Sequence, residues 1–161
     1  IMPAGPRLKF RSNIPAYSEF VFEGVDVDFS KRALQNKEQG VYSAIVGGMS
    51  YGQGSSREHA AICPMYLGVR VVIAKSFERI HSTNLVTFGI LPLVFKNESD
   101  YEKLNHGDEF ILKDVRTAVQ DGNSIPVSVN GTTYEFELLA SDRQRQILLD
   151  GGLLNYTKKN I

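Results

Sequence analysis

Three short apolar runs recur in the first part of the chain, at residues 41–47, 69–74 and 90–95. None of them alternates regularly with polar residues. Strands of a parallel sheet have this character because both faces of such a sheet are buried. The segments between the runs are helical in character, so the pattern predicts a parallel sheet with right-handed crossover connections.

Two crossover helices are expected between these strands. The first begins at Ser55 or Ser56 and kinks or ends near Cys63, because the proline that follows removes a backbone donor. The second has Ser76 as its N-cap and Gly89 as its terminator. Its apolar stripe consists of Phe77, Ile80, Leu85 and Phe88.

The residues before the first apolar run are less regular. Residues 1–15 are rich in Pro and Gly, which predicts an extended or looped lead-in. Residues 18–22 form a candidate strand. Residues 29–37 are expected to form one or two helical turns, which Gly40 ends.

Beyond the third apolar run, the pattern changes to an alternation of apolar and polar residues. Tyr134, Phe136 and Leu138 alternate with glutamates, as expected for a strand with one buried face. Asn130-Gly131 is the expected hairpin turn. The expected strands in this part are residues 109–113, 115–119, 126–129 and 132–139.

Helices are expected on both sides of these later strands. Residues 97–105 suggest a short capped helix. Ser141 and Gln144 form a capping box that opens another helix, and residues 153–156 add a further turn. The whole pattern predicts an α/β fold with a parallel sheet core, crossover helices and an additional, mostly antiparallel strand layer.

A glycine-rich stretch lies between the first strand and the first crossover helix: Tyr-Gly-Gln-Gly-Ser-Ser-Arg-Glu-His, residues 51–59. A turn of this kind presents free backbone N–H groups and the positive end of a helix dipole, so it attracts anions. Two hydroxyls and a guanidinium add carboxylate- or phosphate-binding chemistry. The glycine pattern matches neither a P-loop nor a dinucleotide-binding fingerprint.

A structural explanation competes with this interpretation. Ser55 and Glu58 have the spacing of a capping box, and on spacing alone the cap is favoured. A simple cap, however, requires neither the two glycines, which permit close backbone approach, nor the Ser56-Arg57 pair. The combination therefore favours a binding site.

The same stretch resembles a motif that is highly specific for the aconitase superfamily. The resemblance covers residues 51–61, which contain Gly-Ser-Ser-Arg-Glu-His at residues 54–59, and continues through residues 67–84 and 89–93. Residues 4–11, Ala-Gly-Pro-Arg-Leu-Lys-Phe-Arg, are similar to a segment of aconitases that supplies another substrate arginine. The chain thus resembles the C-terminal swivel domain of this superfamily over nearly all its length. A single swivelling β/β/α domain, residues 1–161, is implied.

The resemblance implies a role for each polar residue of the motif. Aconitases interconvert citrate and isocitrate through cis-aconitate, so the implied substrate is a tricarboxylate. Ser55 corresponds to the catalytic base, and Ser56 and Arg57 correspond to substrate-binding residues. Arg11 corresponds to a further substrate-carboxylate arginine, whereas Arg7 has no such support. A serine base needs strong electrostatic support, which the helix N-terminus and Arg57 would supply.

The family removes hydroxide from its substrate with a 4Fe–4S cluster that has one open iron. Cys63 is the one cysteine of the sequence, so this chain's own thiolates cannot hold a cluster or form an internal disulfide. We expect Cys63 to be a buried structural thiol. The cluster and further substrate arginines are then expected in N-terminal iron–sulfur domains of a larger enzyme, and the isolated domain is expected to be inactive.

Composition argues against several other partners. Eighteen basic and 18 acidic residues give a formal net charge of zero, and no basic stripe is interleaved with aromatics, so nucleic acid is not expected. No apolar run approaches the roughly 20 residues that span a bilayer. The start of the chain shows no signal peptide and looks like part of something longer. A cytoplasmic location is expected, or the mitochondrial matrix in a eukaryote. The three histidines, His59, His81 and His106, are expected to be packed or hydrogen-bonded.

Other assignments stay open. The small subunit of isopropylmalate isomerase is the nearest rival, although it typically has Cys at the position of Gln53 and lacks the Leu-Lys-Phe-Arg lead-in. Homoaconitase and methylcitrate-type dehydratases differ by small substrate groups that loops elsewhere can select. Residues 47–50 also differ from the mitochondrial aconitase pattern. A non-catalytic anion-binding module is the alternative of a different class.

Overall fold

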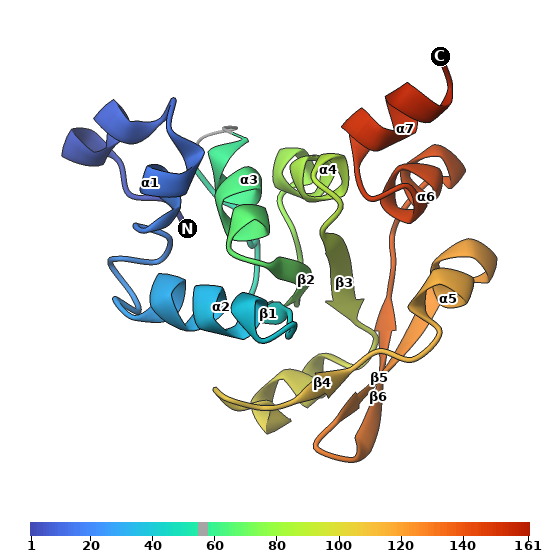
Figure 1. Cartoon of the computed structure of the whole chain (residues 1–161). Coiled ribbons are helices and arrows are strands. Elements are labelled where there is room, and N and C mark those ends of the chain that lie inside the picture. Colours follow the sequence, from blue (N-terminus) through green and yellow to red (C-terminus); the bar gives the residue numbers. More distant parts are fainter. Residues whose placement is uncertain (55–57) are drawn as a thin grey trace.

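A computed structural model describes residues 1–54 and 58–161 of the chain (Figure 1). Within these residues, six strands form one mixed sheet in the order β1-β2-β3-β6-β5-β4. The strands are β1 (Ser43–Gly47), β2 (Val69–Ala74), β3 (Leu91–Phe95), β4 (Phe110–Ile111), β5 (Ser124–Val129) and β6 (Thr132–Glu137). The first three are parallel and the other pairs are antiparallel. The predicted α/β fold is confirmed, and the antiparallel strands extend the same sheet.

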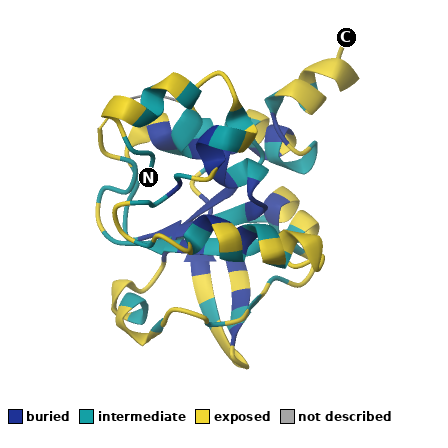
Figure 2. Ribbon diagram, turned by 60° about the vertical axis from the view of Figure 1, so that its left-hand side comes forward, coloured by how far each residue is buried: buried dark blue, intermediate teal, exposed yellow. Residues whose placement is uncertain are grey.

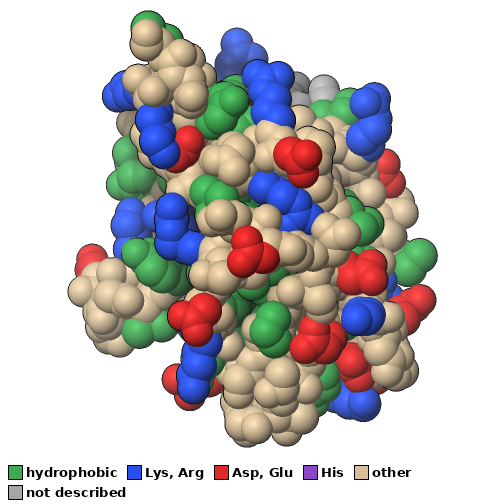
Figure 3. All heavy atoms as spheres, turned by 90° about the vertical axis from the view of Figure 1, so that its right-hand side faces the viewer, with side chains coloured by type: hydrophobic (Ala, Val, Ile, Leu, Met, Phe, Trp, Pro, Cys, Tyr) green, Lys and Arg blue, Asp and Glu red, His purple; other side chains and the backbone are tan. Residues whose placement is uncertain are grey.

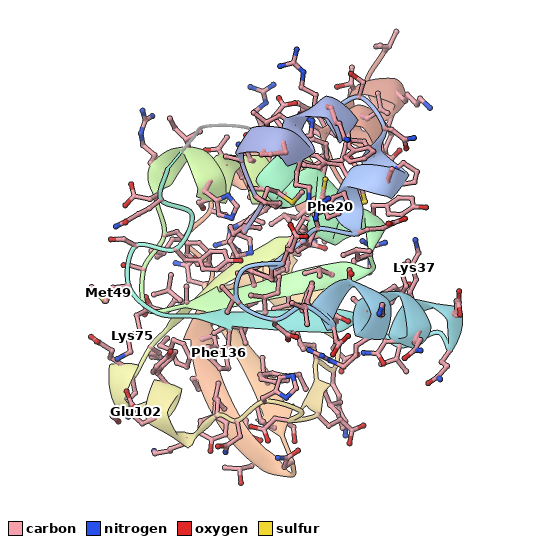
Figure 4. All side chains as sticks on the ribbon, turned by 90° about the vertical axis from the view of Figure 1, so that its left-hand side faces the viewer. Phe20, Lys37, Met49, Lys75, Glu102 and Phe136 are labelled. Atoms are coloured by element: carbon pink, nitrogen blue, oxygen red, sulfur yellow. The ribbon has the colours of Figure 1, made fainter. Side chains whose placement is uncertain are left out.

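The two halves of the sheet enclose one part of the core between them. β3 pairs with β6 only through Val94 with Glu137 and Phe95 with Phe136. The β5–β6 hairpin therefore turns away from the parallel strands, as Figure 4 shows. Buried residues of both halves face the enclosed space: Ile73, Leu91 and Leu93 from the parallel strands, and Ile125, Val127 and Phe136 from the hairpin.

Helices α3 (His59–Tyr66) and α4 (Arg79–Thr87) connect the parallel strands and cover their other face (Figure 1). Figure 2 shows buried residues concentrated where strands and helices meet. The predicted end of α4 at Gly89 is confirmed, because this residue has a φ of +70°. A Cβ at Gly89 would also lie 2.7 Å from the carbonyl oxygen of Gly151, so only glycine fits there.

Both crossover helices depart from their predicted limits. α3 continues through Pro64 to Tyr66 and does not end near Cys63. Proline removes only one backbone donor near the end of this short helix, and burial of Cys63 against the N-terminal segment favours the helical path. α4 begins at Arg79 rather than after Ser76, and Ile80 on the predicted apolar stripe is 48% exposed.

Two predicted strands are wrong. Residues 18–22 belong to the end of α1 (Ile14–Ser18) and the turns after it, because the side chain of Asn13 caps this helix. Residues 115–119 lie in α5 (Val115–Asp121). The apolar positions of α5 have helical spacing, i, i+3 and i+4, and not the spacing of a strand. They are Val115, Ala118 and Val119, which pack on the enclosed core.

The predicted extended or looped lead-in is wrong over residues 5–10, which form the 3₁₀ helix η1 (Gly5–Phe10) with a proline in its first turn. The remaining elements follow the sequence pattern more closely. They are α2 (Phe29–Glu38), α6 (Asp142–Leu149), α7 (Leu153–Lys159) and the 3₁₀ helix η2 (Glu98–Lys103). The capping box of Ser141 and Gln144 is present. Asn130 and Gly131 both have positive φ, as a two-residue hairpin turn requires. No helix in the described ranges has the length and apolar character that crossing a membrane would demand.

A buried arginine connects α6 to the ends of α5 and β6. Arg145 is only 7% exposed. Its guanidinium donates to the carbonyl oxygens of Val119 at 2.8 Å and Leu138 at 3.1 Å. It also donates to the carbonyl of Gly122 and to Oδ1 of Asn123. One side chain thus satisfies carbonyl groups at a helix end that have no helical partner.

Replacing Arg145 with an apolar residue would leave these acceptors buried and unpaired. We expect Arg145→Met to lower the free energy of unfolding by about 3 kcal/mol, measured by urea denaturation. Arg143→Met alters an exposed arginine of the same helix and is the matched control, with an expected change below about 0.5 kcal/mol. Equal stabilities of the two variants would contradict this role of Arg145.

A buried histidine, His81 of α4, lies beside Tyr51. It is 5% exposed, and its ring centroid lies 5.3 Å from that of Tyr51. Its Nε2 has no hydrogen-bond partner among the described residues. Burial lowers the pKa of His81 to about 4, because the imidazolium would lose its hydration. The ring is therefore neutral in the folded chain at pH 7.

This burial predicts a loss of stability in mild acid. As pH falls below the unfolded pKa of 6.5, the unfolded state binds a proton that the folded state does not take up until about pH 4. Between about pH 7.5 and pH 5 this difference should lower the free energy of unfolding by about 2 kcal/mol.

Urea denaturation at both pH values tests this prediction. In His81→Gln, the free energy of unfolding should fall by about 2 kcal/mol less between the two pH values than in the original chain. His106→Gln, at an exposed histidine, should retain the full decrease, and a full decrease in His81→Gln would contradict the explanation.

Candidate functional site

The glycine-rich turn begins where β1 ends, at the carboxyl edge of the parallel strands. Backbone hydrogen bonds join it to the segment that follows β2. The N–H of Lys75 donates to the carbonyl of Gly48 at 3.1 Å, and the N–H of Tyr51 donates to the carbonyl of Ser76 at 2.8 Å. The N–H of Glu78 then donates to the carbonyl of Tyr51 at 3.0 Å. The parallel pairing of β1 and β2 is thereby continued to the start of the turn.

We refer to residues 48–51 and 75–78 as the turn anchor. Figure 4 labels one residue of each segment, Met49 and Lys75, at this edge of the sheet. The hydroxyl Oγ of Ser76 accepts the N–H of Ser50 at 2.7 Å. This hydrogen bond explains why the serine does not cap α4 as predicted, since its hydroxyl is used by the anchor.

Two glycines allow the turn to lie close to the side chains beneath it. A Cβ at Gly47 would lie 2.4 Å from Cδ2 of Tyr51, and a Cβ at Gly52 would lie 2.3 Å from Cγ of His81. Gly52 also has a φ of +94°. Burial beneath the turn raises the pKa of the Tyr51 hydroxyl, so this group stays protonated. The glycines are thus required by contacts as well as by backbone conformation.

A cavity of about 480 Å³ lies between the turn and the first residues of α4. The turn contributes two glycines and a glutamine to its lining, and α4 with the preceding Glu78 contributes polar side chains of both signs. The lining residues are Gly52, Gln53, Gly54, Glu78, Arg79, Ile80, His81 and Asn84. The free N–H groups at the start of a helix favour anions, so this region can accept a carboxylate beside the turn.

Of the predicted site residues, the structure describes Arg11, whose side chain is exposed. The carbonyl oxygen of Arg11 lies 2.9 Å from Nε2 of His59, the first residue of α3, so this ring nitrogen donates the hydrogen bond. The ring of His59 also packs edge-on against Tyr17, with centroids 5.4 Å apart. The structure thus joins the N-terminal lead-in to the start of the helix that follows the motif.

The predicted base Ser55 and the predicted substrate residues Ser56 and Arg57 lie outside the described residues. The positions on either side of them are described. Gly54 belongs to the turn, and Glu58 precedes α3 with helical backbone angles but no side-chain cap. The capping box proposed for Ser55 and Glu58 therefore remains a prediction.

The other polar candidates have structural roles. The three histidines are packed or hydrogen-bonded as predicted, and the exposed His106 contacts Arg32 at 3.3 Å. Cys63 is fully buried, which raises the pKa of its thiol, so its predicted structural role is confirmed. In residues 1–54 and 58–161, no group of His, Cys, Asp or Glu side chains is arranged to hold a metal ion.

Sequence reasoning missed the contributions of Ser76 and His81 beside the turn. Both fall within residues 67–84, which carry part of the resemblance to aconitases. The serine looked like an ordinary N-cap because capping residues and anchoring residues are of the same type. The histidine lies one residue after Ile80, and only the structure shows which of the two faces the turn.

Comparison with known proteins agrees with this geometry. Residues 15–98 match the aconitase C-terminal domain family, a range that includes the 51–59 motif and begins after Arg11. A probable mitochondrial aconitate hydratase of Dictyostelium discoideum is 36% identical over 98% of this chain and 24% of its own length. A mitochondrial homocitrate dehydratase of Saccharomyces cerevisiae is 42% identical over 83% of this chain and 18% of its own length. The chain therefore spans about a quarter or less of these relatives.

A solved structure has a similar fold. The 3-isopropylmalate dehydratase structure from Methanocaldococcus jannaschii has a TM-score of 0.75 and 29% sequence identity, covering 99% of this chain and 84% of that one. The fold, the motif and the sequence match over more than half of the residues lead to one assignment. The chain belongs to the aconitase C-terminal domain family.

Proposed function

We propose that this chain is the C-terminal domain of an aconitate hydratase. In this role it contributes a serine base and carboxylate-binding arginines to the interconversion of citrate and isocitrate through cis-aconitate. The observation that carries the proposal is the position of residues 51–54. In a chain of this family, they form an anchored turn at the carboxyl edge of parallel strands, which is where α/β sheets bind ligands.

Ser55 is the proposed base. The reaction removes a proton from a carbon next to a carboxylate, and the proton acceptor must lie at that carbon. A serine hydroxyl has a pKa far above neutrality, so its deprotonated form needs nearby positive potential. Arg57 and the first N–H groups of α3 are the proposed sources of that potential. Removal of either source should therefore slow proton abstraction.

The proposed substrate-binding residues are Ser56, Arg57 and Arg11. A guanidinium offers two parallel N–H donors that match the two oxygens of a carboxylate. The hydrogen bond between the Arg11 carbonyl and His59 supports a shared site, because it fixes the Arg11 backbone at the start of α3. A tricarboxylate has enough carboxylates to engage groups from two parts of the fold at once.

The residues of this chain do not fit the 4Fe–4S cluster of the family. The sequence contains one cysteine, Cys63, and that thiol is buried within α3. We place the cluster, with the Lewis-acid chemistry it supplies, in N-terminal iron–sulfur domains of a longer enzyme. The small share of the relatives' length that this chain spans supports such domains. The mitochondrial names of these relatives support a location in the mitochondrial matrix.

A second candidate is the small subunit of an isopropylmalate isomerase. It is favoured by one observation, since the chain covers most of a solved 3-isopropylmalate dehydratase chain. The Leu-Lys-Phe-Arg sequence at residues 8–11 and the glutamine at position 53 favour the aconitate hydratase instead. Because one of the relatives is a homocitrate dehydratase, a longer tricarboxylate is an alternative substrate.

The proposal predicts that hydration of cis-aconitate requires both Ser55 and the remainder of the enzyme. The longer enzyme should turn over, whereas the present chain alone should not. In the longer enzyme, Ser55→Ala should lower kcat by about 1,000-fold, because general bases typically contribute a factor of about 100 to 10,000. Ser128→Ala, in the β5–β6 hairpin, is the control and should keep the original rate. Turnover by this chain alone, or an undiminished Ser55→Ala enzyme, would overturn the assignment.

A separate prediction concerns Arg57. Lysine preserves the positive charge but cannot reproduce the two-pronged grip on a carboxylate. In the longer enzyme, Arg57→Lys should raise KM for citrate by about 10- to 100-fold, with a smaller effect on kcat. Arg143→Lys, at an exposed position of α6, is the control for general effects of the exchange. An unchanged KM would show that Arg57 does not hold substrate.

A further inference from the structure

A second cavity, of about 410 Å³, opens at the amino ends of the parallel strands, away from the glycine-rich turn. The first residues of β1 and β3, Ser43 and Leu91, line it, together with Arg70 near the start of β2. The far wall comes from β4, α5 and α6, which close over this face of the sheet. That wall consists of Phe110, Leu112, Val115, Arg116, Val119, Leu148 and Leu149.

The lining of this cavity combines apolar side chains with two cations. Apart from Arg70, Arg116 and Ser43, its side chains are aliphatic or aromatic, and none of the lining residues is acidic. The chain as a whole has no net charge, and Figure 3 shows positive and negative side chains interspersed over the face around α5, α6 and α7. The positive character of the cavity is therefore local.

Both guanidiniums keep donors for a ligand. Nη1 of Arg70 donates to the carbonyls of Met65 at 3.3 Å and Val69 at 3.2 Å, which hold the side chain in place. The guanidinium carbon lies 5.2 Å from the ring centroid of Tyr42, and the other two nitrogens form no hydrogen bond with a residue in the described ranges. Arg116 forms no hydrogen bond or ion pair with a described residue. A carboxylate at the mouth would give these donors an acceptor.

The mouth of the cavity is itself partly apolar. Val41 and Tyr42, just before β1, line the cavity and are 54% and 64% exposed. An aliphatic chain that entered past them would cover apolar surface at the rim as well as inside. Tyr42 also holds the guanidinium of Arg70 at the same opening.

We propose that this cavity binds an aliphatic chain that ends in a single carboxylate. The volume lies within the range of about 300–1,000 Å³ that is usual for small-molecule sites, and the mostly apolar lining with a few polar groups is typical of them. A tricarboxylate would have to bury charges for which only two arginines are available. A neutral chain would leave both guanidiniums unpaired. A monocarboxylate with an aliphatic chain would bury its chain against the apolar wall and pair its carboxylate with the arginines.

Decanoate is a suitable probe, titrated into the whole chain by isothermal calorimetry. We expect saturable binding with one site and a Kd below about 1 mM. Decanol, which has the same chain length without the charge, should bind at least about tenfold more weakly. Acetate, which has the charge without the chain, should show no saturation. Equal binding of decanoate and decanol, or no binding of decanoate, would overturn the proposal.

Variants place the binding within this cavity. Arg116→Glu reverses an exposed charge of the lining and should weaken decanoate binding at least about tenfold. Ala44→Leu fills part of the cavity from β1 and should weaken it similarly, with circular dichroism to verify folding. Arg143→Glu changes an arginine outside the lining and should leave the Kd unchanged.

Two outcomes would reject the proposal. Equal effects of Arg116→Glu and Arg143→Glu on decanoate binding would show that decanoate is attracted nonspecifically by positive charge. Association of two copies by light scattering, abolished by Ala44→Leu, would identify the cavity as a protein contact and reject the proposal.

Discussion

The turn anchor is the constraint on which the rest of the candidate site depends. β1 and β2 end at the same edge of the sheet, and backbone hydrogen bonds between residues 48–51 and 75–78 continue their pairing beyond that edge. Because backbone groups make these bonds, the position of the turn does not depend on long, flexible side chains. Tyr51 and His81 fill the space beneath it. The motif that follows is thus attached to the hydrogen-bonded end of two parallel strands.

The curl of the sheet gives its two ends different chemistry. At the carboxyl edge, the glycine-rich turn and the helix starts offer N–H groups and polar side chains, which suit a highly charged substrate. At the amino edge, the hairpin and α5 enclose an apolar space with arginines at its opening. Since the same strands line both ends, the fold separates the proposed polyanion site from the proposed site for an amphipathic molecule. The neutral net charge of the chain means that each site must attract its ligand locally.

The sequence predicted best where one physical signal dominated. The parallel strands were recognised because burial on both faces requires uninterrupted apolar runs, and the Ser141 capping box because its two partners are local. The sequence-based prediction failed at α5, a short segment whose helical spacing was taken for that of a strand. It also failed at Pro64, where tertiary burial outweighs one lost hydrogen bond. The role of Arg145 depends on carbonyls at the ends of two other elements, α5 and β6, which no local pattern reveals. The residue types of the 51–59 motif were enough to identify it from the sequence. The turn anchor is made by hydrogen bonds between distant segments, so the sequence did not reveal it.

We propose that substrate carboxylates meet the fold at the carboxyl edge of β1 and β2. A crystal structure of the longer enzyme with bound citrate would test this placement. We expect citrate carboxylates within hydrogen-bond distance of the Arg11 and Arg57 guanidiniums, with Oγ of Ser55 next to the carbon that loses its proton. Citrate bound elsewhere, with Ser55 facing away from it, would rule this placement out.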